Sequence, residues 1–142
     1  MSLFLMVLMK KTKNAVRLSS LPMTISLLIL ILFRFVFLLG YVPTASMEPA
    51  LKTGSLLLGV RVWGDIQKGD IIVFQHNKEY LVKRVEAVEG DLIESNGENL
   101  VVPEGGFYVL GDNGQCSYDS RYWEYPFVMN DDIVAKVILP TR

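Results

Sequence analysis

Ser46 and Lys83 are the two residues of this 142-residue chain whose types and settings are best suited to nucleophilic chemistry. Ser46 lies between Pro43 and Pro49, which restrict the backbone on both sides and should hold the serine in a rigid, extended segment. The one histidine, His76, stands in a Gln-His-Asn-Lys stretch typical of an exposed turn between strands. If the serine is a nucleophile, we therefore expect its base to be an amine rather than an imidazole.

Lys83 lies in a hydrophobic strand pattern, Tyr-Leu-Val-Lys-Arg-Val, at residues 80–85. Strand alternation places Leu81, Lys83 and Val85 on one face, so the amine should be surrounded by apolar groups. Desolvation lowers the pKa of such an amine, and a neutral amine can accept the proton of a serine hydroxyl. The alternative interpretation is that Lys83 is one of two charges on a half-exposed strand and that Ser46 is a linker serine.

A third element of interest is the stretch Gly-Asp-Asn-Gly-Gln-Cys-Ser-Tyr-Asp-Ser-Arg at residues 111–121. It is dense in turn-forming residues, and Asp112 and Asn113 can hydrogen-bond the local backbone. Asp119 and Arg121 can pair with each other and fix the loop. The alternative is an ordinary polar loop.

The elements that must position these residues are predicted to be short strands separated by turns. Asn96-Gly97 is a strong signal for a two-residue hairpin, and no stretch after Val42 has sustained helical periodicity. We therefore predict a mainly β fold, a compact antiparallel β-sheet domain over residues 43–142. Runs rich in β-branched and aromatic residues mark its main strands at 55–62, 70–75, 80–88, 107–110 and 132–139.

An apolar run at residues 21–42 precedes this domain and predicts one transmembrane helix. At about 1.5 Å per residue it would rise about 33 Å, enough for a hydrocarbon core of about 30 Å. Arg34 interrupts the run at a cost of roughly 2.5–3.5 kcal/mol, which the surrounding Leu, Ile and Phe can offset. The alternative is a cleavable signal peptide, but a cut near Ala45 would remove the stretch just before Ser46.

Basic residues close before this run set the predicted orientation. By the positive-inside rule they place residues 1–20 in the cytoplasm and residues 43–142 on the far side of the cell membrane. The chain would then be a single-pass membrane protein with its catalytic domain outside the cytoplasm. The basic residues are Lys10, Lys11, Lys13 and Arg17.

Composition argues against several other kinds of protein. A net charge of −1 leaves no electrostatic footprint for nucleic acid. One histidine and one cysteine, Cys116, argue against a zinc site, and a single cysteine forms no internal disulfide. No glycine-rich phosphate loop occurs, so we expect neither a metal nor another cofactor.

Four motifs in one order give the chain a resemblance to the type I signal peptidases, the membrane-anchored serine proteases that remove leader sequences. The last motif is the most specific, and with the apolar run the resemblance covers roughly residues 21–137. The motifs are Ser46–Leu51, which resembles S-M-x-P-T-L; 69–74, which resembles G-D-[IV]-[IV]-x-[FY]; 80–85 followed by Gly90-Asp91, which resembles the box of the general-base lysine; and 111–121, which matches G-D-N-x-x-x-S-x-D-S-R.

The resemblance implies that Ser46 is the nucleophile and Lys83 the general base. It implies supporting roles for five further residues. These are Thr44, whose hydroxyl would help the Ser46 N–H to stabilise the oxyanion; Ser117, which would orient the lysine amine; Asp119 and Arg121, as a supporting ion pair; and Gly111, which would leave room beside the lysine.

The function implied is removal of N-terminal signal peptides from translocated preproteins, after small residues in an Ala-x-Ala pattern. Preproteins, the lipid bilayer and the translocation machinery would be the partners. Ala50 departs from the threonine of the family motif, and the stretch between Asp91 and Gly111 is too short for the large β insertion of many bacterial members. Two alternatives stay open: a specialised relative that matures one pilin or conjugation substrate, and a non-catalytic anchored β scaffold of a secretion complex.

Overall fold

The computed structural model describes residues 21–95 and 97–140. The chain divides into two compact units, Met1–Phe35 and Val36–Arg142. The described part of the first unit, residues 21–35, is helical, and its large apolar side chains are exposed. The predicted cytoplasmic segment, residues 1–20, lies outside the described residues.

The helix predicted over residues 21–42 is too long at its C-terminal end. Helical structure ends at residue 35, and Phe37–Tyr41 form strand β1 instead. In β1, Leu38 packs on the core while Leu39 and Tyr41 are exposed. A strand with apolar side chains on both faces has no alternating pattern, so hydrophobicity alone cannot distinguish it from a continuing helix. Across residues 21–95 and 97–140, no helix combines the length and apolar character needed to cross a membrane.

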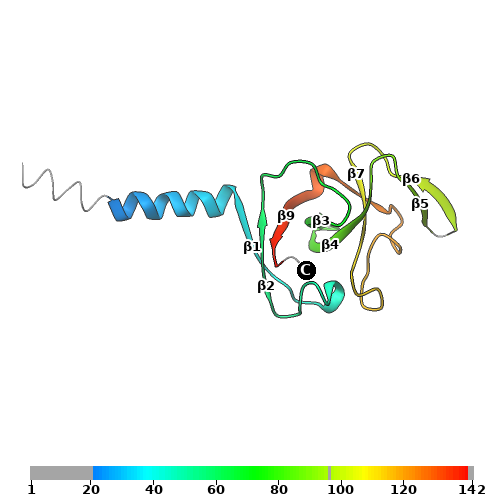
Figure 1. Cartoon of the computed structure of the whole chain (residues 1–142), viewed down its shortest axis with the longest axis horizontal. Helices are drawn as coiled ribbons and strands as arrows, with labels where there is room; N and C mark the ends of the chain where they lie inside the picture. The colour runs from blue at the N-terminus through cyan, green and yellow to red at the C-terminus, as the bar shows by residue number, and fades with distance from the viewer. Residues whose placement is uncertain (1–20, 96, 141–142) are drawn as a thin grey trace, which may run out of the picture. The chain divides into compact units, whose positions relative to one another are not determined.

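The second unit is mainly β, as predicted, and every neighbouring pair of strands in it is antiparallel. Among the described residues, seven strands form one sheet in the order β1-β2-β9-β3-β4-β7-β8, and β5 pairs with β6 in a separate hairpin (Figure 1). Two short 3-10 helices, η1 and η2, complete the unit. The elements are β1 Phe37–Tyr41, η1 Ala45–Met47, β2 Leu56–Val60, β3 Ile71–His76, β4 Glu79–Val88, β5 Leu92–Ser95, β6 Glu98–Val101, β7 Gly106–Leu110, β8 Phe127–Met129, η2 Asn130–Asp132 and β9 Ile133–Leu139.

Two tight hairpins fix strand registers in the β domain. Asn77 and Lys78 connect β3 to β4 with φ values of 49° and 70°, and His76 pairs with Glu79. The second hairpin is the one predicted at 96–97, where Ser95 of β5 pairs with Glu98 of β6. The first of these turns sets which face of β4 carries Lys83, because a slip of one residue would reverse every side chain.

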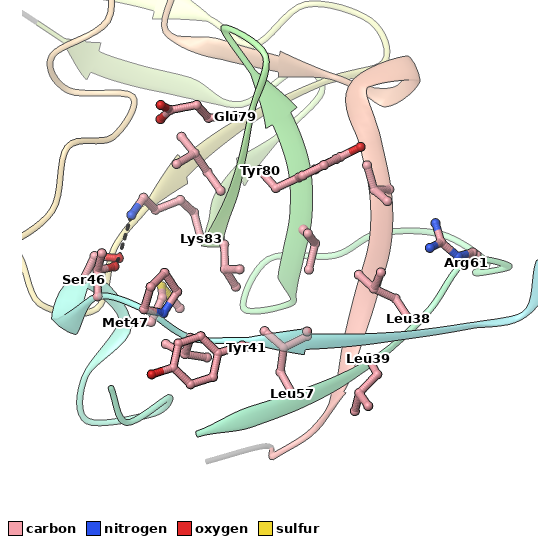
Figure 2. A pocket seen from close by; sticks show the side chains of 18 residues that line it. Leu38, Leu39, Tyr41, Ser46, Met47, Leu57, Arg61, Glu79, Tyr80 and Lys83 are labelled. Carbon is pink, nitrogen blue, oxygen red and sulfur yellow. Dashed lines mark hydrogen bonds between the residues drawn. The ribbon is translucent and has the colours of Figure 1, made fainter. Parts of the chain in front are cut away.

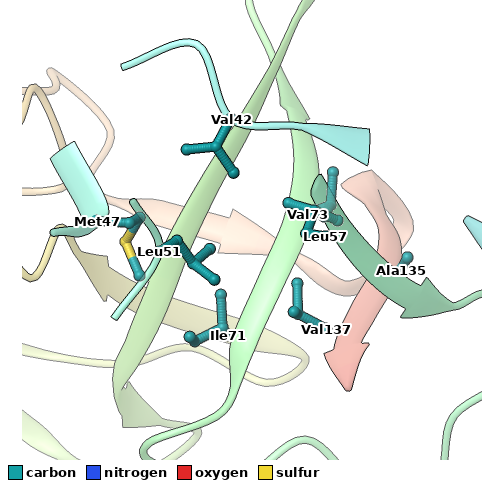
Figure 3. Packing of buried hydrophobic residues seen from close by; sticks show 8 residues of the cluster. All are labelled: Val42, Met47, Leu51, Leu57, Ile71, Val73, Ala135 and Val137. Carbon is teal, nitrogen blue, oxygen red and sulfur yellow. The ribbon is translucent and has the colours of Figure 1, made fainter. Parts of the chain in front are cut away.

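A hydrophobic core beneath η1 explains why an apolar residue follows Ser46. Met47 and Leu51 are 1% and 0% exposed and pack with residues of β2, β3 and β9 (Figure 3). Burying one such side chain stabilises the fold by roughly 1.5–3 kcal/mol. The serine therefore lies in a turn fixed to the core on its C-terminal side. The cluster is Val42, Met47, Leu51, Leu57, Ile71, Val73, Ala135 and Val137.

Candidate active site

Ser46 lies in the middle of η1, where it is 8% exposed. Two of the backbone hydrogen bonds that hold this turn link η1 to residues further along the chain. The Leu51 N–H donates to the Met47 carbonyl at 2.8 Å, and the Asn113 N–H donates to the carbonyl of Ser46 itself at 3.0 Å. The second bond ties the predicted nucleophile directly to the 111–121 loop.

Lys83 projects from β4 toward Ser46 (Figure 2). Its Nζ donates a hydrogen bond to Ser46 Oγ at 2.9 Å, and the side chain is 3% exposed. Val85 on the same face is 1% exposed, as the alternation predicted. Burial lowers the pKa of Lys83, and Arg121 acts in the same direction, while the negative charge of Asp119 opposes both. The structure thus brings the two principal candidates into contact in a largely dehydrated setting.

Thr44 lies beside the same hydroxyl. Its Oγ1 is 3.3 Å from Ser46 Oγ, and its side chain is exposed to solvent. Thr44 is the residue before η1, and its side chain makes no capping hydrogen bond to the short helix.

Asp119 is the fully buried centre of the 111–121 loop, with an exposure of 0%. Its carboxylate accepts hydrogen bonds from the Gly111 N–H at 2.9 Å, from Ser117 Oγ at 2.6 Å, and from Arg121 Nε and Nη2 at 2.8 Å each. Burial alone would raise the pKa of Asp119, but these hydrogen bonds and the Arg121 charge outweigh it and lower the pKa to about 2. The ion pair predicted between Asp119 and Arg121 is present.

Ser117 is paired with Asp119 instead of with the Lys83 amine that the resemblance implied, and Gly111 lies close to Ser117 and to the nucleophile. Ser117 Oγ donates to Asp119, and among the described residues Lys83 Nζ has Ser46 as its hydrogen-bond partner. At Gly111, an added Cβ would overlap the Ser117 side chain and lie 2.6 Å from the Ser46 carbonyl oxygen. The glycine therefore makes room for Ser117 and for the backbone of the nucleophile.

Arg84 and Asp112 form an ion pair that sequence reasoning missed. Arg84 Nε and Nη2 donate to the two Asp112 oxygens at 2.8 Å and 2.7 Å, and Nη1 donates to the Gly69 carbonyl at 2.7 Å. Asp112 was expected to bond the local backbone. The pair links the residue after Lys83 to the residue before Asn113, so it connects the strand of the amine to the loop that holds Ser46. Its only sequence signal was an arginine next to the candidate base.

His76 is at the end of β3, half-buried rather than exposed, and stacks on Trp123 with ring centroids 4.1 Å apart. It has no contact with Ser46 or Lys83 among the interactions described. Across residues 21–95 and 97–140, no group of three or more metal-ligating side chains gathers. The acid–base chemistry available at Ser46 is therefore that of the amine.

A groove of about 540 Å³ leads to Ser46 and Lys83 (Figure 2). Its lining is mostly apolar and comes from β1, from the Glu79–Lys83 half of β4 and from Met47, Leu57 and Val73. Strand β7 pairs with β4 only from Arg84 onward, and β1 is the terminal strand of the sheet as described. Both stretches thus present open backbone edges, and an extended peptide can add to such an edge through main-chain hydrogen bonds.

Comparison with known proteins gives one family and a consistent set of relatives. The family described as "Signal peptidase, peptidase S26" matches residues 15–102 and 95–141. A signal peptidase I of Leptolyngbya laminosa is 29% identical over 135 positions, covering 70% of this chain and 66% of the relative. A signal peptidase IB of Staphylococcus aureus (strain Mu50) is 29% identical over 138 positions, covering 65% and 71%. The chain thus spans about two thirds of the length of these relatives.

Proposed function

The chain belongs to the signal peptidase family, peptidase S26, and we propose that it is a serine endopeptidase that removes N-terminal signal peptides from preproteins. The observation that carries this proposal is the 2.9 Å contact between Lys83 Nζ and Ser46 Oγ, both nearly inaccessible to solvent. A serine hydroxyl needs a base to become a good nucleophile, and a desolvated lysine amine is one of the few side chains able to serve.

In the first step, neutral Lys83 accepts the proton of Ser46 Oγ as the oxygen attacks the carbonyl carbon of the scissile bond. Before this transfer, the hydrogen bond runs from the serine hydroxyl to the neutral amine, the reverse of its direction when the amine is protonated. The lysine next donates this proton to the leaving amine, and the peptide bond breaks. The mature protein leaves, and the leader remains as an ester on Ser46.

The charge that develops on the carbonyl oxygen needs fixed donors. The Ser46 N–H and the Thr44 hydroxyl are proposed for this role because Ser46 lies in η1 and Thr44 immediately precedes it. Thr44 Oγ1, now 3.3 Å from Ser46 Oγ, would turn to the oxyanion when substrate enters. One such donor contributes roughly 2.7–4 kcal/mol to stabilisation of the transition state. Water activated by Lys83 then hydrolyses the ester.

Ser117, Asp119 and Arg121 are proposed as positioning residues. The Asp119 carboxylate holds Ser117 Oγ and the Gly111 N–H in place, and the same loop donates the Asn113 N–H to the Ser46 carbonyl. The loop therefore fixes the nucleophile relative to the lysine without contacting the reacting atoms. The groove leading to this site is proposed to bind the preprotein in an extended form, with small residues in the Ala-x-Ala pattern before the cut.

We place the enzyme at the cell membrane, with the apolar helix at residues 21–35 as its anchor and the β domain outside the cytoplasm. Two observations support a lipid setting. The helix exposes its large apolar side chains, and so does one face of β1, β2 and β9. This apolar face consists of Leu39, Tyr41, Leu56 and Leu139, which are 56–62% exposed. The anchor would bring the enzyme to the depth at which signal peptides leave the bilayer, which reduces the entropic cost of their meeting.

The test is incubation of the purified full-length protein in detergent with several preproteins that carry Ala-x-Ala sites. Mass spectrometry should find one cut after the second small residue in each, and Ser46→Ala should abolish it while circular dichroism stays unchanged. Cleavage of a single pilin-like or conjugation substrate would favour the dedicated alternative. Absence of cleavage in all of them would favour the scaffold and overturn the proposal.

A further inference from the structure

Arg61 is a charged residue of the groove that the proposed mechanism does not use. It follows β2 by one residue and lines the groove at the end opposite Ser46 and Lys83 (Figure 2). We call this the distal end. The first strand of the sheet holds Arg61 in place: its N–H donates to the Val36 carbonyl at 2.7 Å, and its Nε donates to the Phe37 carbonyl at 3.2 Å.

The guanidinium of Arg61 retains unused donors. In the described part of the chain, Nε has the Phe37 carbonyl as its acceptor, and neither Nη1 nor Nη2 has a hydrogen bond or an ion pair. The other two arginines in the described part of the β domain are different, since Arg84 and Arg121 each form bidentate pairs with an aspartate. A half-buried guanidinium beside an apolar wall, with two nitrogens unpaired, is a ready site for a carboxylate.

The length of β1 indicates which substrate residue would reach Arg61. Tyr41 lies at the Ser46 end of the strand and Phe37 at the Arg61 end, four residues apart. A peptide extended alongside β1 advances about 3.3 Å per residue, as the strand itself does. If the residue next to the cut lies near Tyr41, the residue near Arg61 is about the fifth before the cut. The leader side should occupy the groove because the proposed specificity resides in the residues before the cut.

We propose that Arg61 is a specificity-determining residue that binds a carboxylate four to six residues before the cleaved bond. This inference rests on the proposed function. It predicts that the enzyme prefers leaders with Asp or Glu at that place over leaders with Asn, and disfavours Lys there. Glu79, the acidic residue of the lining, lies on β4 and forms no ion pair with Arg61 among the described residues, so it leaves the guanidinium available.

The experiment compares peptides that share an Ala-x-Ala site and differ only by Asp, Asn or Lys at the fifth residue before the cut. For the full-length wild-type enzyme in detergent, kcat/KM should be about fivefold higher for Asp than for Asn, the scale of a partly exposed ion pair. Arg61→Gln should remove this preference, and Arg61→Glu should reverse it in favour of Lys. Lys68→Gln makes the same charge change outside the groove, in an exposed pair with Asp91, and should leave the preference intact.

Several results would overturn the inference while leaving the proposed function in place. These are cleavage without charge preference in the wild type, a preference that survives in Arg61→Gln, or a preference that depends on the fifth residue after the cut. The same comparison is repeated in vesicles with and without phosphatidylglycerol. A uniform loss of cleavage in Arg61→Gln, confined to vesicles that contain this lipid, would instead assign the guanidinium to a lipid phosphate. If the folded wild type cleaves none of the peptides, the proposed function itself fails and the inference with it.

Discussion

At the scale of single residues, the chemistry depends on which charge state Lys83 adopts. Burial favours the neutral amine, whereas the carboxylate of Asp119 favours the ammonium. The Asp119 charge is already engaged by Arg121, Ser117 and the Gly111 N–H, and this limits its effect on the lysine. Burial therefore dominates, and the pKa of Lys83 lies below its ordinary value of 10.5. In the proposed mechanism, the ion pair would support catalysis by occupying the carboxylate.

Replacing Lys83 by methionine tests this balance. Lys83→Met keeps an unbranched chain of similar size and removes the base, so kcat/KM should fall by about 10²–10⁴-fold or more. Thermal unfolding should occur at the same temperature as in the wild type or higher, because a buried amine no longer has to be desolvated. Lys83→Arg should also be inactive, since guanidinium stays protonated. Near-normal cleavage by either variant would contradict the role of the amine.

Asp119 should make the fold sensitive to acid. Its pKa is about 2 in the folded protein against an ordinary value of 3.8, so its contribution to stability is complete above pH 3.8 and is lost as the pH falls through 2. That contribution is about 2 kcal/mol. Asp119→Asn should lower the unfolding temperature at pH 7 and flatten the change in stability between pH 4 and pH 2. Denaturant unfolding at pH 7 and between pH 4 and pH 2 would measure the free energy of unfolding of both proteins. If the stability of Asp119→Asn fell as steeply with pH as that of the wild type, Asp119 would be excluded as the source of the acid sensitivity.

At the scale of elements, the site depends on close contact between η1 and the loop that begins at Gly111. A methyl group at position 111 would overlap Ser117 and press on the Ser46 carbonyl. Gly111→Ala should therefore displace the loop or the nucleophile, with a fall in kcat of at least tenfold and a loss of about 1–3 kcal/mol of stability. Gly114→Ala is the matched control, because the nearest atom to a Cβ there is the end of the flexible Arg121 side chain, at 3.3 Å. Equal losses of kcat and stability in the two variants would contradict a close contact between η1 and the loop that begins at Gly111.

The sequence was informative for local elements and less so for contacts between them. Alternation around Lys83 correctly indicated a buried amine, and Asn96-Gly97 correctly indicated a hairpin. Strand β1 was missed because its residues continue an apolar run, and β8 because it has only three residues. The bidentate pair of Arg84 with Asp112 could not be foreseen, since it joins residues 28 positions apart across two elements. Such contacts depend on the packing of the whole sheet, which no local pattern encodes.

At the scale of the whole molecule, the β domain exposes an apolar face whose contact with water is unfavourable. Four large side chains, Leu39, Tyr41, Leu56 and Leu139, are more than half exposed on β1, β2 and β9. Exposed apolar patches on soluble domains usually mark a partner or a lipid surface. The apolar helix at residues 21–35 precedes β1 closely in the chain, so a lipid surface is consistent with both features.

We expect this apolar face to matter for substrates in membranes and not for soluble ones. The full-length variant Leu56→Ser with Leu139→Ser changes two residues of this face that do not line the groove, and it should cleave a soluble peptide in detergent at the wild-type rate. It should cleave preproteins embedded in vesicles several-fold more slowly, because less apolar surface enters the interface. The pair Leu92→Ser with Val101→Ser is the control, since these residues pair across the β5–β6 hairpin and are 68% and 60% exposed. If the control variant cleaved vesicle-embedded preproteins equally slowly, the result would contradict a specific role for the apolar face.

The central claim, that a desolvated Lys83 amine activates Ser46, is tested most directly by titrating that amine. Carbon-13 NMR of the lysine Cε in the full-length protein in detergent, with Lys83→Arg for assignment, gives the pKa, and the pH dependence of kcat/KM gives the ionisation that governs cleavage. We predict a midpoint below 10.5 and cleavage that rises with pH through the same midpoint. An amine that titrates at 10.5 or above, or cleavage that does not follow its deprotonation, would contradict the central claim.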